Sequence, residues 1–277
     1  MYRVWNNFKT TLLMAGLMGL CLAVGYAIGG QAALMPALLI GGVMNFIAFF
    51  FSDKIALATV RAVEISRDKD PVLWDIVRRL TERAELPMPR VYISPAAAPN
   101  AFATGRSPAH SAVCVTAGLR IILGEDELAG VIAHELSHIK NRDILISTIA
   151  AIVAGAISWL SYMVFWSGGS RDRRIHPLIA LLLMVLAPLA AALIQMAISR
   201  SREFEADRSG ARLAGSGRSL ASALSKLDMA SRHIPLPVPD SQANMFIVAP
   251  FTGSNFAKLF MTHPPVEERI KRLMNPE

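Results

Sequence analysis

Four long apolar runs without a charged residue constrain this chain more than any other feature of its sequence. They cover residues 11–30, 32–51, 144–166 and 178–199. A helix that crosses a bilayer needs about 20 predominantly apolar residues, so each run is long enough for one span. Hydrophobic residues make up 53% of the 277 residues and charged residues only 18%. The sequence therefore predicts an integral membrane protein with a modest polar part.

The first two apolar runs predict a retained hairpin anchor. Arg3 and Lys9 precede the first run, an arrangement that resembles a secretory signal. The run is long for a signal peptide, and a second run follows at once through an uncharged turn around residues 29–31. We therefore expect the first run to remain in the membrane as one arm of a hairpin.

Basic residues on both flanks of this hairpin predict its orientation. The first run is preceded by Arg3 and Lys9. The second run is followed by four basic residues: Lys54, Arg61, Arg67 and Lys69. Positively charged flanks stay in the cytoplasm, so we expect residues 53–143 and 200–277 there as well. The turn between the third and fourth runs also contains three arginines, within residues 171–174. A second hairpin that dips into the membrane without crossing it is the alternative.

The net charge of +7 is explained by cationic flanks that hold the spans against anionic lipid. The chain has no block of lysine and arginine with interleaved aromatic residues, so nucleic-acid binding is not predicted. Cys21 and Cys114 are the two cysteines, and their positions predict neither a disulfide framework nor a cysteine metal site.

The polar segments predict a mixed domain of helices and short strands. Apolar residues at helical spacing predict helices over 70–86 and 124–142, and the second has acidic residues in its first turn. Three further helices are predicted over 201–213, 218–233 and 264–274. Segments rich in valine, isoleucine and tyrosine predict strands over 88–94 and 111–118, with an extended edge over 99–105 between them.

The motif "HELSH" predicts a metal site on the helix over 124–142. His134 and His138 are four residues apart, so they share one helical face and can offer two nitrogens to one ion. Glu135 is adjacent to that face and can reach a water on the metal as general base. Gly130, one turn earlier on the same face, is expected to leave space above the site.

The third ligand must come from beyond the third and fourth apolar runs. Asn141 and Ile144 stand where a metzincin would have glycine and histidine, and residues 144–166 contain no acid. The segment "SREFEAD" offers Glu203 as a ligand, with Asp207 on the same helical face to orient a ligating histidine. Glu205 faces away in a regular helix and is interpreted as a solvated charge.

Four motifs in order resemble one family. "PNAFATG", "HELSHIKNRD", "SREFEAD" and "THPPVEERI" are together similar to the HtpX family of bacterial inner-membrane zinc metalloproteases, relatives of the eukaryotic CAAX prenyl endoproteases. The resemblance implies a gluzincin-type zinc endopeptidase, with its active site facing the cytoplasm, that acts in membrane protein quality control and stress response. Its partners would be protein substrates, above all misfolded membrane proteins, and membrane lipids.

The resemblance also implies residue roles. His134, His138 and Glu203 would bind one Zn²⁺ per subunit, with Glu135 as catalytic base. His263 would stabilise the oxyanion. Arg269 is expected to pair with an acid such as Asp207 rather than with substrate. An edge strand would pair with the substrate backbone, and its residues would be Asn100, Ala101, Phe102, Ala103 and Thr104.

The predicted architecture is a mainly α integral membrane protein with four membrane helices and a cytoplasmic α+β protease domain containing a small sheet. Residues 1–52 form the first membrane hairpin and 144–199 the second; residues 53–143 and 200–277 form the two halves of the protease domain. Two other classes are disfavoured: a scaffold with structural zinc needs a fourth cysteine or histidine ligand, and a transporter needs charges within its spans. A specific CAAX-type processing peptidase is the alternative enzyme.

Overall fold

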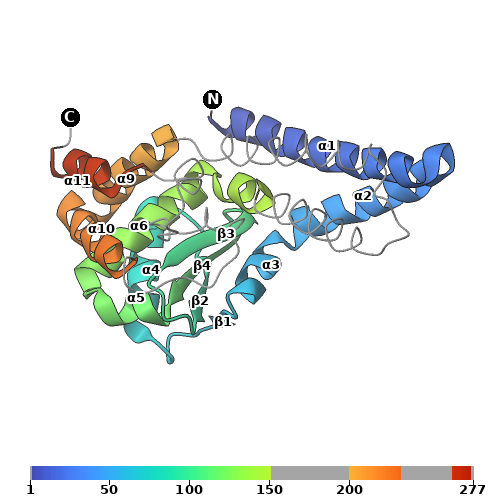
Figure 1. Ribbon diagram of the computed structural model, residues 1–277. Coiled ribbons are helices and arrows are strands. Elements are labelled where there is room, and N and C mark those ends of the chain that lie inside the picture. Colours follow the sequence, from blue (N-terminus) through green and yellow to red (C-terminus); the bar gives the residue numbers. More distant parts are fainter. Residues whose placement is uncertain (1, 151–199, 232–263, 276–277) are drawn as a thin grey trace.

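The computed structural model describes residues 2–150, 200–231 and 264–275 (Figure 1). It begins with two long helices, α1 (Tyr2–Gly29) and α2 (Leu34–Phe50), joined by a 3₁₀ turn over Gly30–Ala33. The segments Asn7–Tyr26 and Gly30–Phe50 are long and apolar enough to cross a membrane. Side chains such as Leu39 and Val43 are exposed on α2, as expected for a surface that faces lipid. The hairpin projects away from the rest of the molecule.

The second predicted hairpin lies outside the described residues except for its first turns. Residues 144–150 are helical. In this segment Ile146 and Ile149 are buried against Leu13 and Leu17 of α1. The third apolar run therefore starts along the first helix of the hairpin.

The sheet has four short strands, β1 (Val63–Glu64), β2 (Arg90–Ser94), β3 (Ala101–Ser107) and β4 (His110–Thr116). Their spatial order is β1-β2-β4-β3, with β2 and β4 parallel and the other two pairs antiparallel. The strands predicted over 88–94, 99–105 and 111–118 correspond to β2, β3 and β4. Since β3 has β4 as its only strand neighbour among the described residues, it lies at an edge of the sheet.

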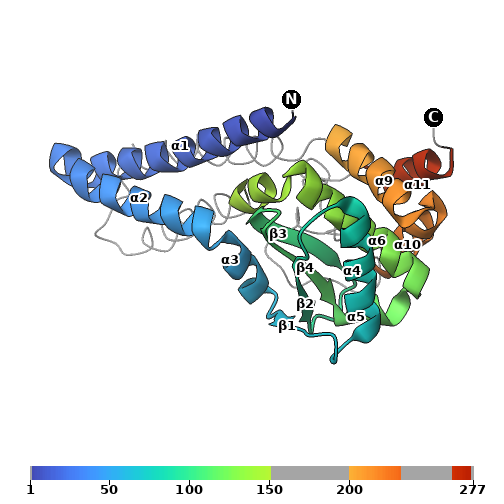
Figure 2. The ribbon, with the colours of Figure 1, turned by 180° about the vertical axis from the view of Figure 1, so that it is seen from behind.

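Alternate residues of the strands enter two different clusters. On one face, Val113 and Val115 of β4 pack beneath α4 (Pro71–Ala84) and α6 (Glu125–Asn141). On the other face, Ala112 and Cys114 pack against α3 (Ser52–Thr59). Figure 2 shows α3 beside the sheet, seen from behind. This period of two is the geometry of a strand buried on both faces.

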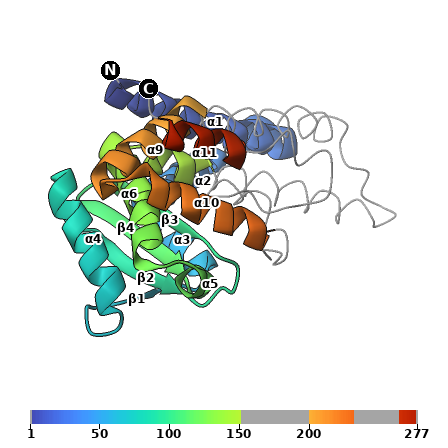
Figure 3. The ribbon, with the colours of Figure 1, turned by 90° about the vertical axis from the view of Figure 1, so that its left-hand side faces the viewer.

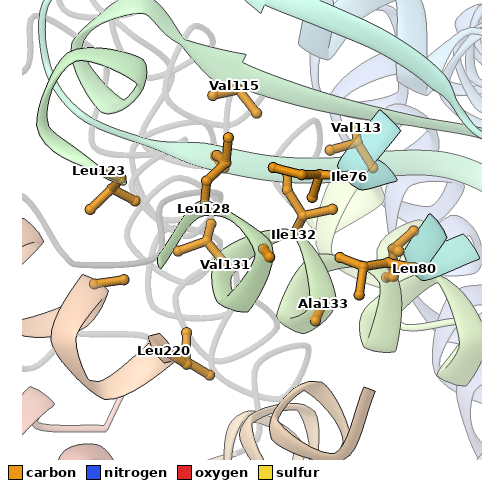
Figure 4. Packing of buried hydrophobic residues seen from close by; sticks show 14 of the residues in the cluster. Ile76, Leu80, Val113, Val115, Leu123, Leu128, Val131, Ile132, Ala133 and Leu220 are labelled. Atoms are coloured by element: carbon orange, nitrogen blue, oxygen red, sulfur yellow. The ribbon is translucent and has the colours of Figure 1, made fainter. Parts of the chain in front are cut away.

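Helix α6 is the centre of the part of the molecule that follows the first hairpin. The sheet and α4 cover one side of it, and α9 (Arg200–Ala214) and α10 (Gly217–Ser231) cover the other (Figure 3). Helix α11 (Val266–Met274) packs on α10 and α9. In Figure 4, Leu128 and Ile132 point toward the strands and Ile76 of α4, whereas Val131 points toward Leu220 of α10. A helix enclosed in this way must be apolar on more than one face, so its polar residues need a specific reason to be there.

The predicted helices begin where the sequence supplies caps. Asp70 accepts a hydrogen bond of 3.0 Å from the backbone N–H of Leu73, and Pro71 occupies the first turn of α4. Glu127 accepts one of 2.9 Å from the backbone N–H of Gly124 at the start of α6. These contacts satisfy backbone donors that have no partner within the helix.

Three elements were not predicted: α3, β1 and the short helix α5 (Ala117–Ile122). Residues 117 and 118 were assigned to the end of a strand, which is wrong. Thr116 instead caps α5 by accepting a hydrogen bond from the N–H of Leu119. A Cβ on Gly118 would come within 1.9 Å of the carbonyl oxygen of Ala97. The chain can therefore turn into α5 at this point only because residue 118 lacks a side chain.

Replacing Ile132 with alanine tests the central position of α6. Ile132 is fully buried, so Ile132→Ala should lower the free energy of unfolding by about 2–5 kcal/mol. Ile121→Ala is the matched control, because Ile121 is 83% exposed and should change stability by less than about 0.5 kcal/mol. Urea titration of the detergent-purified protein, followed by tryptophan fluorescence, measures both. Equal decreases in the free energy of unfolding for the two variants would show that α6 is not at the centre of the core.

Candidate metal centre

Two histidines of α6 and one glutamate of α9 converge on one point. The Nε2 atoms of His134 and His138 lie 3.2 Å apart. Each also lies 3.7 Å from an oxygen of Glu203. Ligand atoms around a tetrahedral zinc, with bonds of about 2.0–2.2 Å, are separated by roughly 3.3–3.6 Å. The three side chains therefore have the donor types and spacing of a zinc site, and they could hold a metal ion.

The close approach of α6 and α9 makes this convergence possible. Gly210 of α9 lies against the backbone of His134, and a Cβ at Gly210 would come within 2.9 Å of His134 Cα. Gly130 of α6 has a different role from the one predicted. It packs against the backbone of Leu220, within 2.8 Å of where its Cβ would be. The expectation that Gly130 leaves open space above the site was wrong, because α10 occupies that space.

Each histidine has a carboxylate at its other ring nitrogen. His134 Nδ1 lies 2.9 Å from Oδ1 of Asp207, and His138 Nδ1 lies 3.3 Å from Oδ2 of Asp143. A carboxylate at Nδ1 favours a proton on that nitrogen and leaves the lone pair of Nε2 available. Both lone pairs then face the point shared with Glu203.

Asp143 was missed by sequence reasoning, which considered it as a metal ligand and excluded it. Helix α6 ends at Arg142, whose backbone is left-handed with φ of 60°. This turn brings the backbone N–H of Asp143 to the carbonyl of His138 at 3.0 Å. Its side chain thereby reaches the outer nitrogen of the same histidine. The spacing of five residues between His138 and Asp143 predicts this contact only if the helix is known to end just before Asp143.

A buried arginine supports Asp207. Arg269 of α11 is fully buried and donates two hydrogen bonds to the Asp207 carboxylate, at 2.8 and 2.7 Å. Burial alone would raise the pKa of Asp207, but Arg269 and His134 hold that pKa at about 2. The predicted pairing of Arg269 with Asp207 is confirmed. This ion pair connects α11 to the histidine helix through α9.

The electrostatics of the centre differ between the two histidines: burial lowers the pKa of His134, whereas nearby carboxylates favour a positive charge at His138. Burial opposes a charge on His138, yet the carboxylates of Glu203 and Asp143 raise its pKa to about 9. A site that stabilises a proton so strongly on a ligand nitrogen also stabilises a metal ion in its place. Burial raises the pKa of Glu135 to about 7, near the value suited to a general base.

Glu135 is attached to the edge of the sheet. Its Oε2 accepts a hydrogen bond of 2.8 Å from the backbone N–H of Ala103 in β3. This N–H points away from β4, so by the alternation of an antiparallel ladder that of Ala101 does so too. The side chains of Phe102 and Thr104 are buried. The predicted substrate strand could therefore meet a substrate through its backbone rather than through these side chains.

Three further residues were predicted at or near the site: Glu205, Asn100 and His263. Glu205 is partly exposed and pairs with Arg208 at 3.1 Å, away from the histidines, as expected. The backbone of Asn100 exchanges hydrogen bonds with Thr116 of β4. His263 lies outside the described residues, so its role stays a prediction.

This arrangement of donors, base and edge strand matches a known peptidase family. The profile of Peptidase family M48 matches residues 67–277. The chain belongs to peptidase family M48. It is 51% identical over 275 residues to a "Protease HtpX homolog" from Pelotomaculum thermopropionicum, covering 97% of this chain and 98% of the relative. A second homologue, from Thermodesulfovibrio yellowstonii, is 53% identical and covers 97% of both chains.

A solved structure supports the fold. The crystal structure of Ste24p from S. mikatae matches with a TM-score of 0.51 at 16% identity, covering 98% of this chain and 66% of that one. The identities near 50% over almost the whole length assign the chain to the HtpX proteases, and the resemblance inferred from the four motifs is confirmed. The protein is thus a metalloprotease of the HtpX type.

Removing the buried arginine tests the support of the centre. Arg269→Met leaves the buried charge of Asp207 without its cationic partner, with only His134 beside it, which should lower the free energy of unfolding by about 3–5 kcal/mol. Arg212→Met, at an exposed position of α9, should change it by less than about 0.5 kcal/mol. Urea titration with zinc chelated measures both. Adding Asp207→Asn to Arg269→Met should recover part of the loss; no recovery would argue against the pair as its cause.

Proposed function

We propose that this HtpX-type protease is a zinc endopeptidase of the bacterial inner membrane. It would cleave misfolded or damaged membrane proteins at the cytoplasmic face, in membrane protein quality control and the stress response. The observation that supports this most is the position of Glu135: it lies next to the His134–His138–Glu203 donors and bonds to the outward edge of β3. Hydrolysis of a peptide by a metalloprotease uses a base, a metal site and a strand edge that binds the substrate. Here Glu135 is in contact with both of the other two.

Zinc is the metal that fits the donor set best. Two imidazole nitrogens and one carboxylate are the ligands of many catalytic zinc sites, which keep a fourth position for water. No cysteine sulfur lies in the cluster, and an all-oxygen set for Mg²⁺ or Ca²⁺ is not present in it. We infer one Zn²⁺ per subunit, held by His134, His138 and Glu203.

The residues of the chain divide the chemistry among them. Bound zinc supplies an acidified water and polarises the scissile carbonyl. Glu135 takes a proton from the attacking water and passes it to the leaving amine. Asp207 and Asp143 keep the two imidazoles oriented, and His263 donates to the developing oxyanion. Burial of Glu135 gives it a pKa of about 7, so it can both accept and release the proton near neutral pH.

The outward edge of β3 is proposed to bind substrate as an added strand. Ala103 donates its N–H to Glu135 in the structure, and a substrate strand along the same edge would present its carbonyl beside the base. The proposed contacts run along Asn100, Ala101, Phe102, Ala103 and Thr104. Backbone pairing of this kind recognises the extended conformation of a substrate and not the identity of its side chains. It would suit an enzyme whose substrates share an unfolded state and not a sequence.

Orientation follows from the ends of the hairpin. Helix α1 begins and α2 ends at the protease domain (Figure 1), which supports the proposal that both basic flanks and the catalytic site are on one side of the membrane. The positive-inside rule assigns that side to the cytoplasm. We propose that residues 144–199 form a second membrane hairpin, which the packing of Ile146 and Ile149 on α1 supports.

Replacing the base tests the proposed mechanism. Glu135→Gln should retain near-stoichiometric zinc and lose casein cleavage by at least about 10²-fold, because proton transfer by a positioned base contributes about 10²–10⁴-fold. Glu205→Gln is the control and should cleave casein like the parent. The same assay with a prenylated CAAX peptide separates the alternative: cleavage of the peptide but not of casein would refute a quality-control role. Retained casein cleavage by Glu135→Gln would refute the base.

Metal analysis of three variants tests the ligand assignment. Glu203→Ala should lose zinc and all activity, since it removes one of three ligands. Asp207→Ala should lower zinc affinity about 10–100-fold by freeing the His134 imidazole. Glu205→Ala should bind zinc like the parent. The assignment is reversed if Glu205→Ala is empty of metal while Glu203→Ala is full.

A further inference from the structure

A second polar site lies where the protease domain meets the membrane hairpin. A pocket is formed there by three segments distant in sequence: the start of α1, the end of β3, and the turn and first helical residues that follow α6. Its polar lining consists of Asn7, Thr10, Arg106, Ser107 and Arg142. None of its described lining residues is acidic. A pocket with two guanidinium groups and three neutral polar side chains fits an anion.

The two arginines are available for a ligand. Neither Arg106 nor Arg142 forms an ion pair with a carboxylate within the described ranges. The nearby acid, Asp143, faces His138 at 3.3 Å and Arg202 at 3.8 Å instead. Arg202 thus competes with Arg142 for that carboxylate. The positive charge of the pocket is therefore not neutralised by the acid that follows Arg142.

The pocket lies at the depth of the membrane surface. The first candidate span begins at Asn7, which lines the pocket, and the second ends at Phe50. The guanidinium of Arg106 lies 5.4 Å from the centre of the Phe50 ring. An arginine at the end of a span, stacked on an aromatic residue, places its charge among lipid headgroups. This placement holds whichever side of the membrane the domain occupies.

The pocket also has an apolar side that leads into the bilayer. Ile144 and Leu145 complete its lining. The helix that starts there continues along α1, with Ile146 and Ile149 against Leu13 and Leu17. A ligand with its phosphate at the arginines would have its hydrocarbon next to these apolar helices. A free inorganic ion would make no favourable contact with this apolar surface.

We propose that this pocket binds the phosphate group of an anionic phospholipid. The phosphodiester would accept hydrogen bonds from Arg106 and Arg142, with Asn7 beside them as a neutral donor. Arg142 forms the turn that ends α6, and the next residue, Asp143, faces a histidine of the metal centre. The lipid would thus seat the protease domain on the membrane at a point next to Asp143, the carboxylate that faces His138.

Native mass spectrometry in a neutral detergent tests the proposal. The full-length chain carries Glu135→Gln, which prevents self-cleavage and makes the result independent of the proposed proteolytic function. Phosphatidylglycerol, phosphatidylcholine and inorganic phosphate are the three probes. We expect one phosphatidylglycerol to bind in preference to phosphatidylcholine. Inorganic phosphate should not displace it at equal concentration; displacement would show a site for a free ion and overturn the lipid assignment.

Two double variants locate the binding. A basic residue near an anionic surface contributes about fivefold in affinity, so Arg106→Gln with Arg142→Asn should weaken phosphatidylglycerol binding roughly 25-fold. Asparagine tolerates the left-handed backbone at position 142. Arg212→Gln with Arg218→Gln removes the same charge outside the pocket and should bind like the parent. If the first variant does not fold, Arg106→Gln alone should bind about fivefold more weakly. Unchanged binding in the folded pocket variants would refute the site.

Discussion

The contact between α6 and α9 at Gly210 is the constraint on which the rest of the structure depends. The missing Cβ lets the two helix backbones approach until Gly210 lies against the backbone of His134. At this distance Asp207 and Glu203, one and two turns earlier on α9, reach opposite nitrogens of the same imidazole. A larger residue would separate both carboxylates from the histidine together. The geometry of ligand and supporting acid is therefore set by one backbone contact.

The centre places several ionisable groups in the interior, and burial of each one is unfavourable by itself. Asp207 and Arg269 satisfy each other through two short hydrogen bonds, whereas Glu203 and Glu135 lie near a histidine that is drawn toward the charged form. Replacing buried ion pairs with apolar residues often stabilises a protein. The helix that carries the two histidines and Glu135 is otherwise apolar on both sides. The presence of ionisable residues there is explained by their chemistry rather than by stability. A divalent cation at the histidines would offset the excess negative charge.

Local sequence determines the features that were predicted correctly. The helix over 124–142 was recognised because acidic residues open it and apolar residues recur at helical spacing. Glu203 was selected because the intervening runs contain no suitable acid. Features that depend on distant contacts were not accessible: the neighbour of Gly130 is on α10, 90 residues away in the chain. Asp143 was missed because Arg142, a residue that rarely adopts a left-handed backbone, does so here.

The order of the centre along the chain has a consequence for how the enzyme is made. The histidines are synthesised before the apolar residues 144–199, whereas Glu203 and Arg269 are synthesised only after them. A ribosome-bound chain would therefore carry an incomplete centre through most of its translation, since domains form as their segments become available. A product truncated before α11 would lack the partner of Asp207. Hydrolytic competence would therefore arise only after the apolar segment between the histidines and Glu203 has been synthesised, which protects the earlier part of the nascent chain from cleavage.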